Sequence, residues 1–506
     1  MILLKRVSLL RYCLALALTA LVSACASIEP QTDRPAEFAM APAPLAQWPA
    51  LDPISARDVM VPLNDGAVAL TWRLRLLQAA TQSIDLQTFI WQDDKVGTAL
   101  VAEVLAAADR GVKVRVILDD SFLAHADAQL HALSEHPNIR YRIYNPLAVR
   151  YGGTALRQLE NLSDFERINH RMHNKLLLVD GRVAIVGGRN QADEYFGLRE
   201  EHNFRDMEVV LQGPFLDSLS RVFDLYWNDP WTLPIEDLTE GNEQLDLAAE
   251  RAQLASNAMR APSPTPATQA EWAELFATGF TGDLKIVVDT PTDPDAETVQ
   301  PVQVAESLLS LIDATESDLL LVSAYFIPTE PLTEALRRAT QRGVRVRVLT
   351  NSLGSNNHVT AHAAYANHRP ELLRAGIELY ELRADASDRG KYIFSAAEDS
   401  VLGLHAKFAL FDDWGLFVGS SNLDPRSLRI NTEVGAQVDS PELNAQVREF
   451  FSVDLHPRNA WRVRLTENDE VIWEGEEGVV LDAPPASFFM RAESWFFGLL
   501  PIESQM

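Results

Sequence analysis

Apolar residues recur at helical spacing early in the chain, and a segment of strand character follows them. Val101, Val104, Leu105 and Ala108 stand at positions i, i+3, i+4 and i+7, which predicts one apolar face of an amphipathic helix. Gly111 suits the end of that helix, because glycine readily adopts the left-handed conformation found there. The β-branched residues that come next predict a strand.

The same order of elements returns in the second half of the chain. An apolar helix face is formed by Leu332, Ala335, Leu336 and Ala339, and Gly343 suits the helix end. A β-branched segment again follows. Strands that alternate with helices indicate an α/β fold, so we expect two domains, each a mostly parallel mixed sheet flanked by helices.

The two regions are copies of one another. Their matched residues share one offset of 232 positions: Arg110 with Arg342, His173 with His405, Lys175 with Lys407, Gly187 with Gly419, and Asn190 with Asn422. Separate chance matches would not share an offset, so the chain contains a duplicated domain. We expect the first copy at 51–228 and the second at 284–455, with a connecting insert at 229–283 and a C-terminal extension at 456–506.

The N-terminus has the features of an export signal. Lys5 and Arg6 precede an apolar stretch too short to span a bilayer comfortably, and small residues lead to Cys25. This ending resembles the bacterial lipobox, which implies a signal peptide at 1–24, lipidation of Cys25 and a location in the cell envelope. Residues 25–50 are rich in proline and alanine and predict a tether. An ordinary signal peptide and an uncleaved anchor remain alternatives.

Charge and cysteine content exclude several classes of protein. The formal net charge is −27, and so acidic a surface repels polyanions, so nucleic-acid binding is not expected. The two cysteines, Cys13 and Cys25, both lie near the N-terminus. The body of the protein therefore has neither a disulfide framework nor a cysteine-based metal site.

One motif that carries chemistry occurs once in each half, in the form H-x-K-x4-D-x6-G-x2-N. Its polar members are His173, Lys175, Asp180 and Asn190 in the first copy and His405, Lys407, Asp412 and Asn422 in the second. Histidine and lysine two positions apart on a strand point to the same face. The aspartate follows an apolar run and supplies turn chemistry before the next strand.

These residue types suit phosphodiester transfer, which needs a nucleophile, a proton donor for the leaving oxygen and cations for the non-bridging oxygens. One imidazole attacks phosphorus and forms a phosphohistidine. The other donates a proton to the leaving oxygen and then acts as base toward an acceptor hydroxyl. Lys175 and Lys407 would neutralise the phosphate, and Asn190 and Asn422 would donate hydrogen bonds to it. The motif requires no metal and no other cofactor.

The motif resembles the HKD motif of the phospholipase D superfamily, and the resemblance covers about Leu51 to Leu455 outside the insert. It implies a pseudo-twofold arrangement in which both motifs form one shared active site. A monomer would then suffice, and the oligomeric state stays open. The resemblance also implies His173 as the nucleophile and His405 as the acid and base, although the duplication makes these roles formally interchangeable. Asp180 and Asp412 belong to the catalytic motifs and are expected to brace their loops.

Members of this superfamily carry an acid that orients each histidine. The candidates are Glu433, which lies 28 residues after His405, and Asp206, which lies 33 residues after His173. A carboxylate on the second ring nitrogen holds an imidazole in the orientation that a nucleophile needs. The alternative for each acid is a surface or capping carboxylate.

Weaker signals come from other residues. His358, His362 and His368 have no acidic partner pattern, so solvated or substrate-facing histidines are favoured over a metal site. Tyr325 and Asn351 end strands of the second half and are candidates for the pocket entrance. The aromatic residues near the C-terminus could enter a bilayer interface. We favour the alternative, an aromatic clamp that packs on the domain core.

Within the superfamily, the chain looks most like the bacterial cardiolipin synthases of C type. The resemblance rests on segments 187–196, 223–227, 419–427 and 500–503. It implies phospholipid substrates at a membrane surface and transfer of a phosphatidyl group to phosphatidylglycerol, with the donor lipid left open. A phospholipase D-type hydrolase, acting on lipid or less plausibly on nucleic acid, is the alternative, because exclusion of water decides between the two reactions. A non-catalytic binding module is opposed by the two complete motifs.

Overall fold

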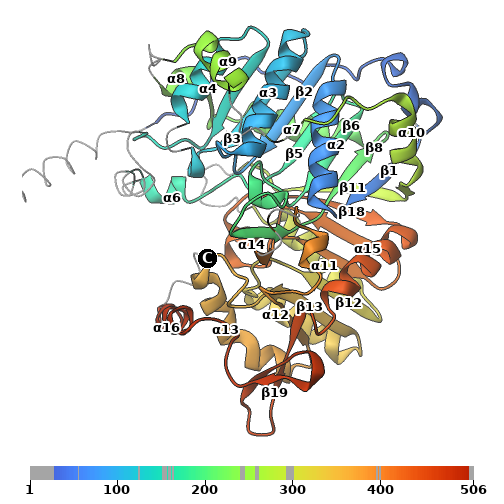
Figure 1. Ribbon diagram of the computed structural model, residues 1–506, viewed down its shortest axis with the longest axis vertical. Coiled ribbons are helices and arrows are strands. Elements are labelled where there is room, and N and C mark those ends of the chain that lie inside the picture. Colours follow the sequence, from blue (N-terminus) through green and yellow to red (C-terminus); the bar gives the residue numbers. More distant parts are fainter. Residues whose placement is uncertain are drawn as a thin grey trace, which may run out of the picture.

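The computed structural model describes residues 28–54, 56–123, 126–150, 157, 161, 164–239, 245–256, 261, 263–291, 301–394, 397 and 400–500. Two halves are stacked along the long axis of the molecule, each built around one large sheet with helices on its faces (Figure 1). The expected signal peptide and Cys25 lie outside the described residues. No helix in the described ranges is long and apolar enough to cross a membrane.

The first sheet has nine strands. In spatial order they are β10 (Phe280–Thr281), β1 (Val59–Leu63), β8 (Glu208–Gln212), β6 (Val183–Gly187), β5 (Leu176–Val179), β2 (Ser83–Thr88), β3 (Lys113–Asp119), β4 (Ile139–Tyr144) and β9 (Thr232–Pro234). A separate two-stranded sheet joins the halves, and it pairs β7 (His202–Arg205) with β15 (Val401–Leu404) in parallel.

The second sheet has ten strands and repeats this order. They are β11 (Asp283–Val288), β18 (Val434–Asp439), β17 (Gly415–Gly419), β16 (Phe408–Phe411), β12 (Asp318–Val322), β13 (Arg345–Asn351), β14 (Glu378–Leu382), β19 (Ala460–Leu465), β20 (Val471–Glu474) and β21 (Val480–Leu481). The equivalent places of β2, β3, β5 and β6 on one side and β12, β13, β16 and β17 on the other confirm the duplicated α/β fold.

The direction of the strands corrects one detail of the prediction. Parallel pairing is confined to β2, β3 and β4 in the first half and to β12, β13 and β14 in the second. The remaining pairs within the two large sheets are antiparallel. The sheets are mixed, as expected, but mostly antiparallel, because each motif is followed by a hairpin (β5 to β6, β16 to β17) rather than by a crossover helix.

The longer helices cover the sheets. They are α2 (Gly66–Ala79), α3 (Lys95–Asp109), α4 (Asp127–Ser134), α7 (Leu216–Trp227), α9 (Leu247–Ser256), α10 (Gln269–Ala277), α11 (Gln303–Ala314), α12 (Glu330–Gln341), α13 (Val359–Arg374), α15 (Pro441–Asp454) and α16 (Phe488–Phe497). Three short ones are α6 (Phe165–Ile168), α8 (Ile235–Leu238) and α14 (Pro425–Arg429).

The two predicted amphipathic helices are α3 and α12, and all eight residues assigned to their apolar faces are buried. The Asp94 carboxylate caps α3 by accepting a hydrogen bond from the Gly97 N–H. Gly111 and Gly343 follow the two helices with φ of 97° and 88°, a conformation that glycine adopts without strain. Both helix ends are therefore as the sequence predicted.

One apolar core is shared by the two halves. It contains Leu178, Val186 and Phe223 of the first half and Leu410, Val418 and Phe451 of the second. Helices α7 and α15 contribute to this layer, and each half also has a core of its own beneath its remaining helices. Because burial of apolar surface opposes separation, the two halves are held in a fixed arrangement.

The predicted tether at 25–50 is corrected in its described part, which packs on the first half as an extended strap. The Gln31 N–H donates to the Pro230 carbonyl at 2.9 Å, and the Ala39 N–H donates to the Asp224 carboxylate. Ala43 and Trp48 are buried in the first core. The prolines disfavour an α-helix, and the strap ends in two short 3-10 helices, η1 (Leu45–Gln47) and η2 (Pro49–Ile54). Enough backbone donors and apolar side chains remain to fasten it.

The described parts of the expected insert, 229–283, are folded rather than extended. Strand β9 pairs with β4, and α8 and α9 pack on α4. Helix α10 packs against β1, and β10 pairs with the same strand. Since β11 pairs with β18 of the second sheet, the chain passes from one half to the other at Gly282.

The C-terminal helix α16 also differs from the prediction of a clamp. Ser494 is the buried residue of this helix, and its Oγ lies 3.3 Å from Nδ1 of His362 on α13. A small side chain allows the two helices to approach closely, so the aromatic residues point away from the core. The described C-terminal extension consists of β19, β20, β21 and α16.

Candidate active site

Each motif histidine is fixed by the backbone of the other half. The His173 N–H donates to the Thr432 carbonyl at 2.9 Å, and the His405 N–H donates to the Arg205 carbonyl at 2.8 Å. Thr432 directly precedes Glu433, and Arg205 directly precedes Asp206. These backbone contacts therefore bring each candidate acid to the histidine of the opposite half.

The acids pair with the histidines across the interface. Nδ1 of His173 lies 3.0 Å from both carboxylate oxygens of Glu433, and Nδ1 of His405 lies 2.6 Å from Oδ2 of Asp206. Spacing along the chain relates each acid to the histidine of its own half. In the structure, each acid instead contacts the histidine of the opposite half. In both pairs Nδ1 is occupied, so Nε2 is the ring nitrogen left for chemistry.

Two lysines complete the buried cluster. Nζ of Lys175 donates to the His173 carbonyl at 2.7 Å, and Nζ of Lys407 donates to the His405 carbonyl at 2.5 Å. Burial lowers the pKa of Lys175 to about 7, against the opposing effect of Glu433. Burial also lowers the pKa of Lys407 to about 8, against Asp206. An arriving phosphate anion would favour the charged form of both side chains.

Burial favours the neutral form of both imidazoles. Burial lowers the pKa of His173 to about 4, although Glu433 opposes the shift. Burial, together with the charges of Lys407 and Lys175, lowers the pKa of His405 well below its usual value. A neutral imidazole has a free lone pair on Nε2, which is the state that a nucleophile requires.

The motif asparagines follow β6 and β17, at the ends nearest the histidines. Both Asn190 and Asn422 are buried, and Oδ1 of Asn190 accepts a hydrogen bond from the Ile90 N–H at 3.1 Å. Because a backbone donor holds its oxygen, the amino group of Asn190 is the part suited to a phosphate oxygen.

The motif aspartates lie at the other ends of β5 and β16 and do not contact the histidines. Asp180 accepts hydrogen bonds from the N–H groups of Gln82 and Ser83, both at 2.8 Å. Asp412 accepts from the Ser317 N–H at 2.7 Å and the Asp318 N–H at 2.9 Å. Each aspartate thus fastens its hairpin turn to the start of the neighbouring strand, which is the bracing role that was expected.

A second pair of bracing residues was missed. Asp119 ends β3, and its Oδ2 accepts from the N–H of Met172, the residue before His173. Asn351 ends β13, accepts from the Leu404 N–H at 2.7 Å and donates to the Leu404 carbonyl at 2.8 Å. The proposed place of Asn351 at the pocket entrance is therefore wrong. Asp119 and Asn351 share the 232-residue offset, which was a signal that could have found them.

Aromatic rings surround the two imidazoles. The ring of Phe89 lies 4.8 Å from that of His173, and Phe89 in turn lies 5.3 Å from Phe122. Tyr195 and Phe204 lie 4.9 Å and 5.0 Å from the ring of His405. Sequence analysis did not assign these rings to the site, although Tyr195 belongs to a segment that carried the family resemblance.

Glu433 has a further hydrogen-bond partner in Ser420. Its Oγ donates to Oε2 of Glu433, and the equivalent position in the first half is Gly188. A Cβ atom on Gly188 would lie 2.3 Å from Oδ1 of Asp206, so no side chain fits there. The two halves of the site are therefore not chemically identical.

His362 and Tyr325, two further residues singled out in the sequence, lie on or beside helix α13. His362 is buried rather than solvated, and its Nε2 lies 2.6 Å from an Arg369 nitrogen. Tyr325 packs against His358, with 5.3 Å between their ring centroids, and donates to Oδ1 of Asn357. The described residues contain no group of three His, Cys, Asp or Glu side chains that could hold a metal ion.

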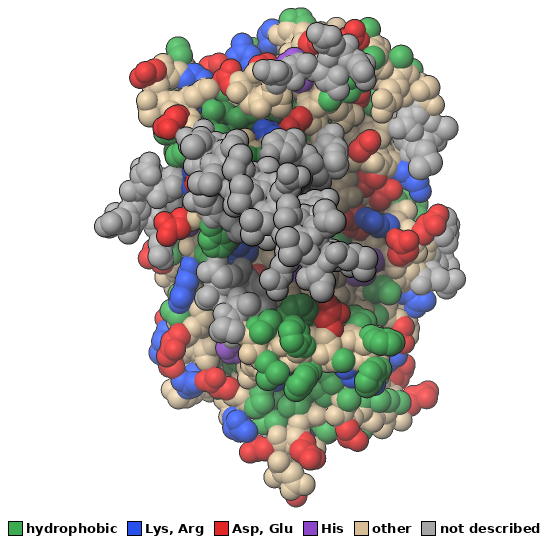
Figure 2. All heavy atoms as spheres, turned by 90° about the vertical axis from the view of Figure 1, so that its left-hand side faces the viewer, with side chains coloured by type: hydrophobic (Ala, Val, Ile, Leu, Met, Phe, Trp, Pro, Cys, Tyr) green, Lys and Arg blue, Asp and Glu red, His purple; other side chains and the backbone are tan. Residues whose placement is uncertain are grey.

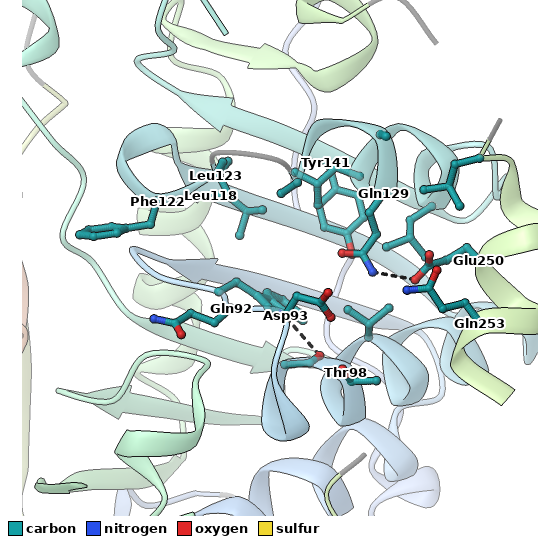
Figure 3. Close-up of a pocket in the computed structure, with 18 residues that line it drawn as sticks. Gln92, Asp93, Thr98, Leu118, Phe122, Leu123, Gln129, Tyr141, Glu250 and Gln253 are labelled. Carbon is teal, nitrogen blue, oxygen red and sulfur yellow. Dashed lines mark hydrogen bonds between the residues drawn. The ribbon is translucent and has the colours of Figure 1, made fainter. Parts of the chain in front are cut away.

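A cavity of about 430 Å³ lies between the first sheet and helices α3, α4 and α9, and Phe122 is one of its lining residues (Figure 3). Tyr141, Gln129, Glu250 and Gln253 meet at one end, and Gln129 donates to Glu250 at 2.7 Å. Its lining residues include no histidine and no lysine. This cavity is therefore not where the motif histidines act.

Comparison with known proteins agrees with the duplicated fold and the paired motifs. The family described as "Cardiolipin synthase, PLD-like domain" matches residues 74–227 and 308–455. "Cardiolipin synthase C" of Escherichia coli K12 is 33% identical over 461 residues, which cover 88% of this chain and 95% of that protein. "Major cardiolipin synthase ClsA" of Bacillus subtilis 168 is 25% identical over 78% of this chain and 68% of its own length.

A solved structure supports the same fold. The phosphatidylserine synthase of Haemophilus influenzae Rd KW20 aligns with a TM-score of 0.55 over 82% of this chain and 92% of its own, at 13% identity. Identity this low supports the fold alone. The family match over both halves and the 33% identity show more, and the chain therefore belongs to the cardiolipin synthase-type PLD-like family of the phospholipase D superfamily.

Proposed function

We propose that this chain is a phosphatidyltransferase that forms cardiolipin from phosphatidylglycerol and a second phospholipid. The observation that carries the proposal is the pair of buried imidazoles, each with Nδ1 against a carboxylate of the opposite half. This arrangement leaves two Nε2 atoms and two lysines to act on one phosphate. The 33% identity to a protein named cardiolipin synthase C supports the choice of substrate.

In the first step, Nε2 of His173 attacks the phosphorus of the donor lipid. A P–N bond forms, the P–O bond to the headgroup alcohol breaks, and protonated His405 gives its proton to the leaving oxygen. Lys175, Lys407 and the two motif asparagines hold the non-bridging oxygens. Burial lowers the pKa of His405, and binding of the anionic phosphodiester opposes this shift by favouring the protonated ring.

In the second step, His405 is neutral and acts as the base. It accepts the proton of a phosphatidylglycerol hydroxyl, whose oxygen attacks phosphorus while the P–N bond to His173 breaks. Glu433 and Asp206 orient the two rings through both steps. The reaction returns His405 to its protonated state and leaves His173 neutral, so the cycle closes without a cofactor.

Hydrolysis by a phospholipase D route is the second candidate, because water can replace the lipid alcohol in the same step. The rings of Phe89, Tyr195 and Phe204 favour transfer, since they place apolar surface beside both imidazoles. Apolar walls hinder water at the intermediate while they accept a lipid glycerol.

Product analysis tests the proposal. Purified protein is incubated with labelled phosphatidylglycerol, with and without phosphatidylethanolamine, and the lipid products are separated. Accumulation of labelled cardiolipin supports transfer, and stimulation by phosphatidylethanolamine identifies it as a donor. Phosphatidic acid as the dominant product would instead identify a phospholipase D. Full, reversible loss of activity in a chelator would contradict the metal-free mechanism.

The location belongs to the same proposal. Lipidation of Cys25 would anchor the protein in the bacterial cell envelope, beside its substrates. Cys25→Ser should then release or misprocess the protein, whereas Cys13→Ser should not. Unchanged membrane fractionation and an unchanged N-terminal mass for Cys25→Ser would leave only an uncleaved anchor.

A further inference from the structure

Helix α16 presents an apolar ridge to solvent. Six large apolar side chains of this helix and the residues after it are between 39% and 82% exposed: Phe488, Phe489, Trp495, Phe496, Leu499 and Leu500. Phe488 and Trp495 are seven residues apart, as are Phe489 and Phe496, so they project from one face of the helix. We call these six residues the α16 ridge.

The ridge is held rigidly by its opposite face. Ser494 contacts His362 of α13, and His362 is itself fixed by Arg369. The Gly498 carbonyl accepts a hydrogen bond from Asn367 at 3.5 Å. Since α13 is anchored in the second core through Ala361, Ala364 and Tyr365, the exposed rings stand on a fixed support rather than on a loose tail.

The segment that carries the ridge contains few charged residues. Between positions 483 and 500, Arg491 and Glu493 are the charged residues, whereas the whole chain has a formal net charge of −27. Figure 2 shows hydrophobic side chains gathered on the side of the molecule that carries α16. An apolar surface of this kind is unusual on a protein that meets only water, and it marks a contact surface.

The ridge belongs to the same half of the molecule as His405, and a chain of contacts links the two. The segment leading into α16 touches the loop after β13, where a Cβ on Gly354 would lie 2.7 Å from the Pro485 carbonyl. That loop begins at Asn351, which holds the backbone of Leu404 next to His405. On the other half, α6 lies on the same side of the molecule as α16 and leads directly to His173 (Figure 1).

A second exposed ring lies on the half that contains His173. Phe122 is 49% exposed, and its ring is linked through Phe89 to the ring of His173 by centroid distances of 5.3 Å and 4.8 Å. Apolar rings therefore extend from the surface to His173 on the first half. The ridge belongs to the second half, which contains His405.

We propose that the α16 ridge inserts into a phospholipid bilayer and seats the rim of the active site against it. The inference rests on the proposed function, because it takes the substrate to be a lipid within the bilayer. Aromatic and leucine side chains that project from a helix with only two charged residues suit the boundary between headgroups and acyl chains. The acidic remainder of the protein is repelled by anionic lipids, so an uncharged face is the one that can make contact.

Quenching of Trp495 tests the insertion directly. The full chain carrying His405→Ala, which cannot consume lipid, is bound to vesicles of phosphatidylglycerol and phosphatidylethanolamine with brominated acyl chains. We expect quenching of tryptophan fluorescence that Trp495→Phe removes in large part. Trp414→Phe is the matched control, because Trp414 lies at the far end of β16 from His405 and should not contribute. Unquenched Trp495 in vesicle-bound protein overturns the proposal.

Kinetics provide a second reading. Phe488→Ser combined with Phe496→Ser should lower activity on vesicles about tenfold or more, because it removes the apolar surface that enters the bilayer. Activity on short-chain phosphatidylglycerol below its critical micelle concentration should stay within about twofold of the wild type, since the site itself is unchanged. An equal loss on both substrates overturns the docking role.

Two further outcomes are distinguishable. If the ridge instead joins two copies of the chain, the double variant converts a dimer to a monomer in sedimentation and brominated lipid does not quench Trp495, and the proposal is wrong. If no lipid product forms from any substrate, the proposed function fails, but bromolipid quenching of Trp495 still supports docking. The two hypotheses therefore stand or fall on separate measurements.

Discussion

The two halves of the active site share one fold but differ in how their histidines are held. His173 faces Glu433, which accepts a further hydrogen bond from Ser420. His405 faces Asp206, beside which Gly188 leaves no room for a side chain. A duplicated domain has therefore produced two imidazoles with different surroundings.

The pKa values of the two acids, Glu433 and Asp206, are shifted in opposite directions. Burial alone would raise the pKa of Glu433, but His173 and Lys175 outweigh burial and keep the pKa below its usual value. Burial raises the pKa of Asp206, and Lys407 and Arg189 do not fully offset it. Glu433 is thus the more firmly ionised partner. This asymmetry is in line with the proposed role of His173 as the nucleophile, because the acid that orients its ring is the one whose pKa is lowered.

Removal of either histidine should have the largest effect. His173→Ala and His405→Ala should each lower turnover by roughly a thousandfold or more while the protein remains folded, because nucleophile and acid are both required. Near-normal activity in either variant would contradict the two-histidine mechanism.

A substrate with a good leaving group separates the two roles. An aryl phosphodiester needs no proton donor for its first step, so His405→Ala should still form a phosphorylated protein, detected by intact mass. His173→Ala should form none. The reverse pattern would exchange the roles of the two halves.

The acids should differ in their effects. Glu433→Gln should lower turnover by about a hundredfold or more, because it removes the charge that orients the ring of His173. Asp206→Asn should cost about tenfold less, because Asp206 holds the ring of His405 through one oxygen, whereas Glu433 contacts the ring of His173 through both oxygens and is itself held by Ser420. Equal losses of turnover in the two variants would contradict the proposed difference between the two acids.

Ser420→Gly converts the second half to the arrangement of the first. The loss of one hydrogen bond to a charged group should slow phosphohistidine formation by about tenfold. Ser421→Gly is the matched control, because the Ser421 hydroxyl donates to the Asn422 carbonyl and not to Glu433. Rapid-quench rates that fall equally in both variants would argue against a specific role for Ser420.

The smallest expected effect is on stability. The pKa of His173 is lowered to about 4, whereas an imidazole in the unfolded chain titrates near 6.5. Between these values the unfolded state binds more protons, so the free energy of unfolding should fall as the pH decreases, by up to roughly 1.4 kcal/mol per unit for this group. Urea unfolding measures the free energy of unfolding of the wild type and of His173→Gln at several pH values. This free energy should depend less steeply on pH in the variant. Identical slopes would indicate an imidazole that is not held neutral.

Sequence reasoning could establish the duplication and the motif residues, because both are repeated at one offset. It also identified the bracing aspartates, since a turn between two strands limits what such a residue can do. The crossing of Glu433 and Asp206 was out of reach. Spacing along one half carries no information on which half supplies the partner, and only the packing of the halves decides it.

The strap and helix α16 were predicted wrongly, because composition does not specify which surface a segment packs against. Residues 28–50 are rich in proline and alanine, yet Ala43 and Trp48 find an apolar surface on the first half and bury there. The aromatic residues of α16 would suit a core equally well. Their exposure follows from Ser494, whose small side chain is the one that faces α13.

The strap has a mechanical consequence for any anchor at Cys25. Its first described backbone contact is at Gln31, which donates to the Pro230 carbonyl. A chain extends at most about 3.6 Å per residue, so a leash from Cys25 to Gln31 could reach only roughly 20 Å. A catalytic body on so short a leash cannot diffuse away from the bilayer. It would remain confined to a layer only a few lipid headgroups deep, where the search for a second substrate becomes two-dimensional.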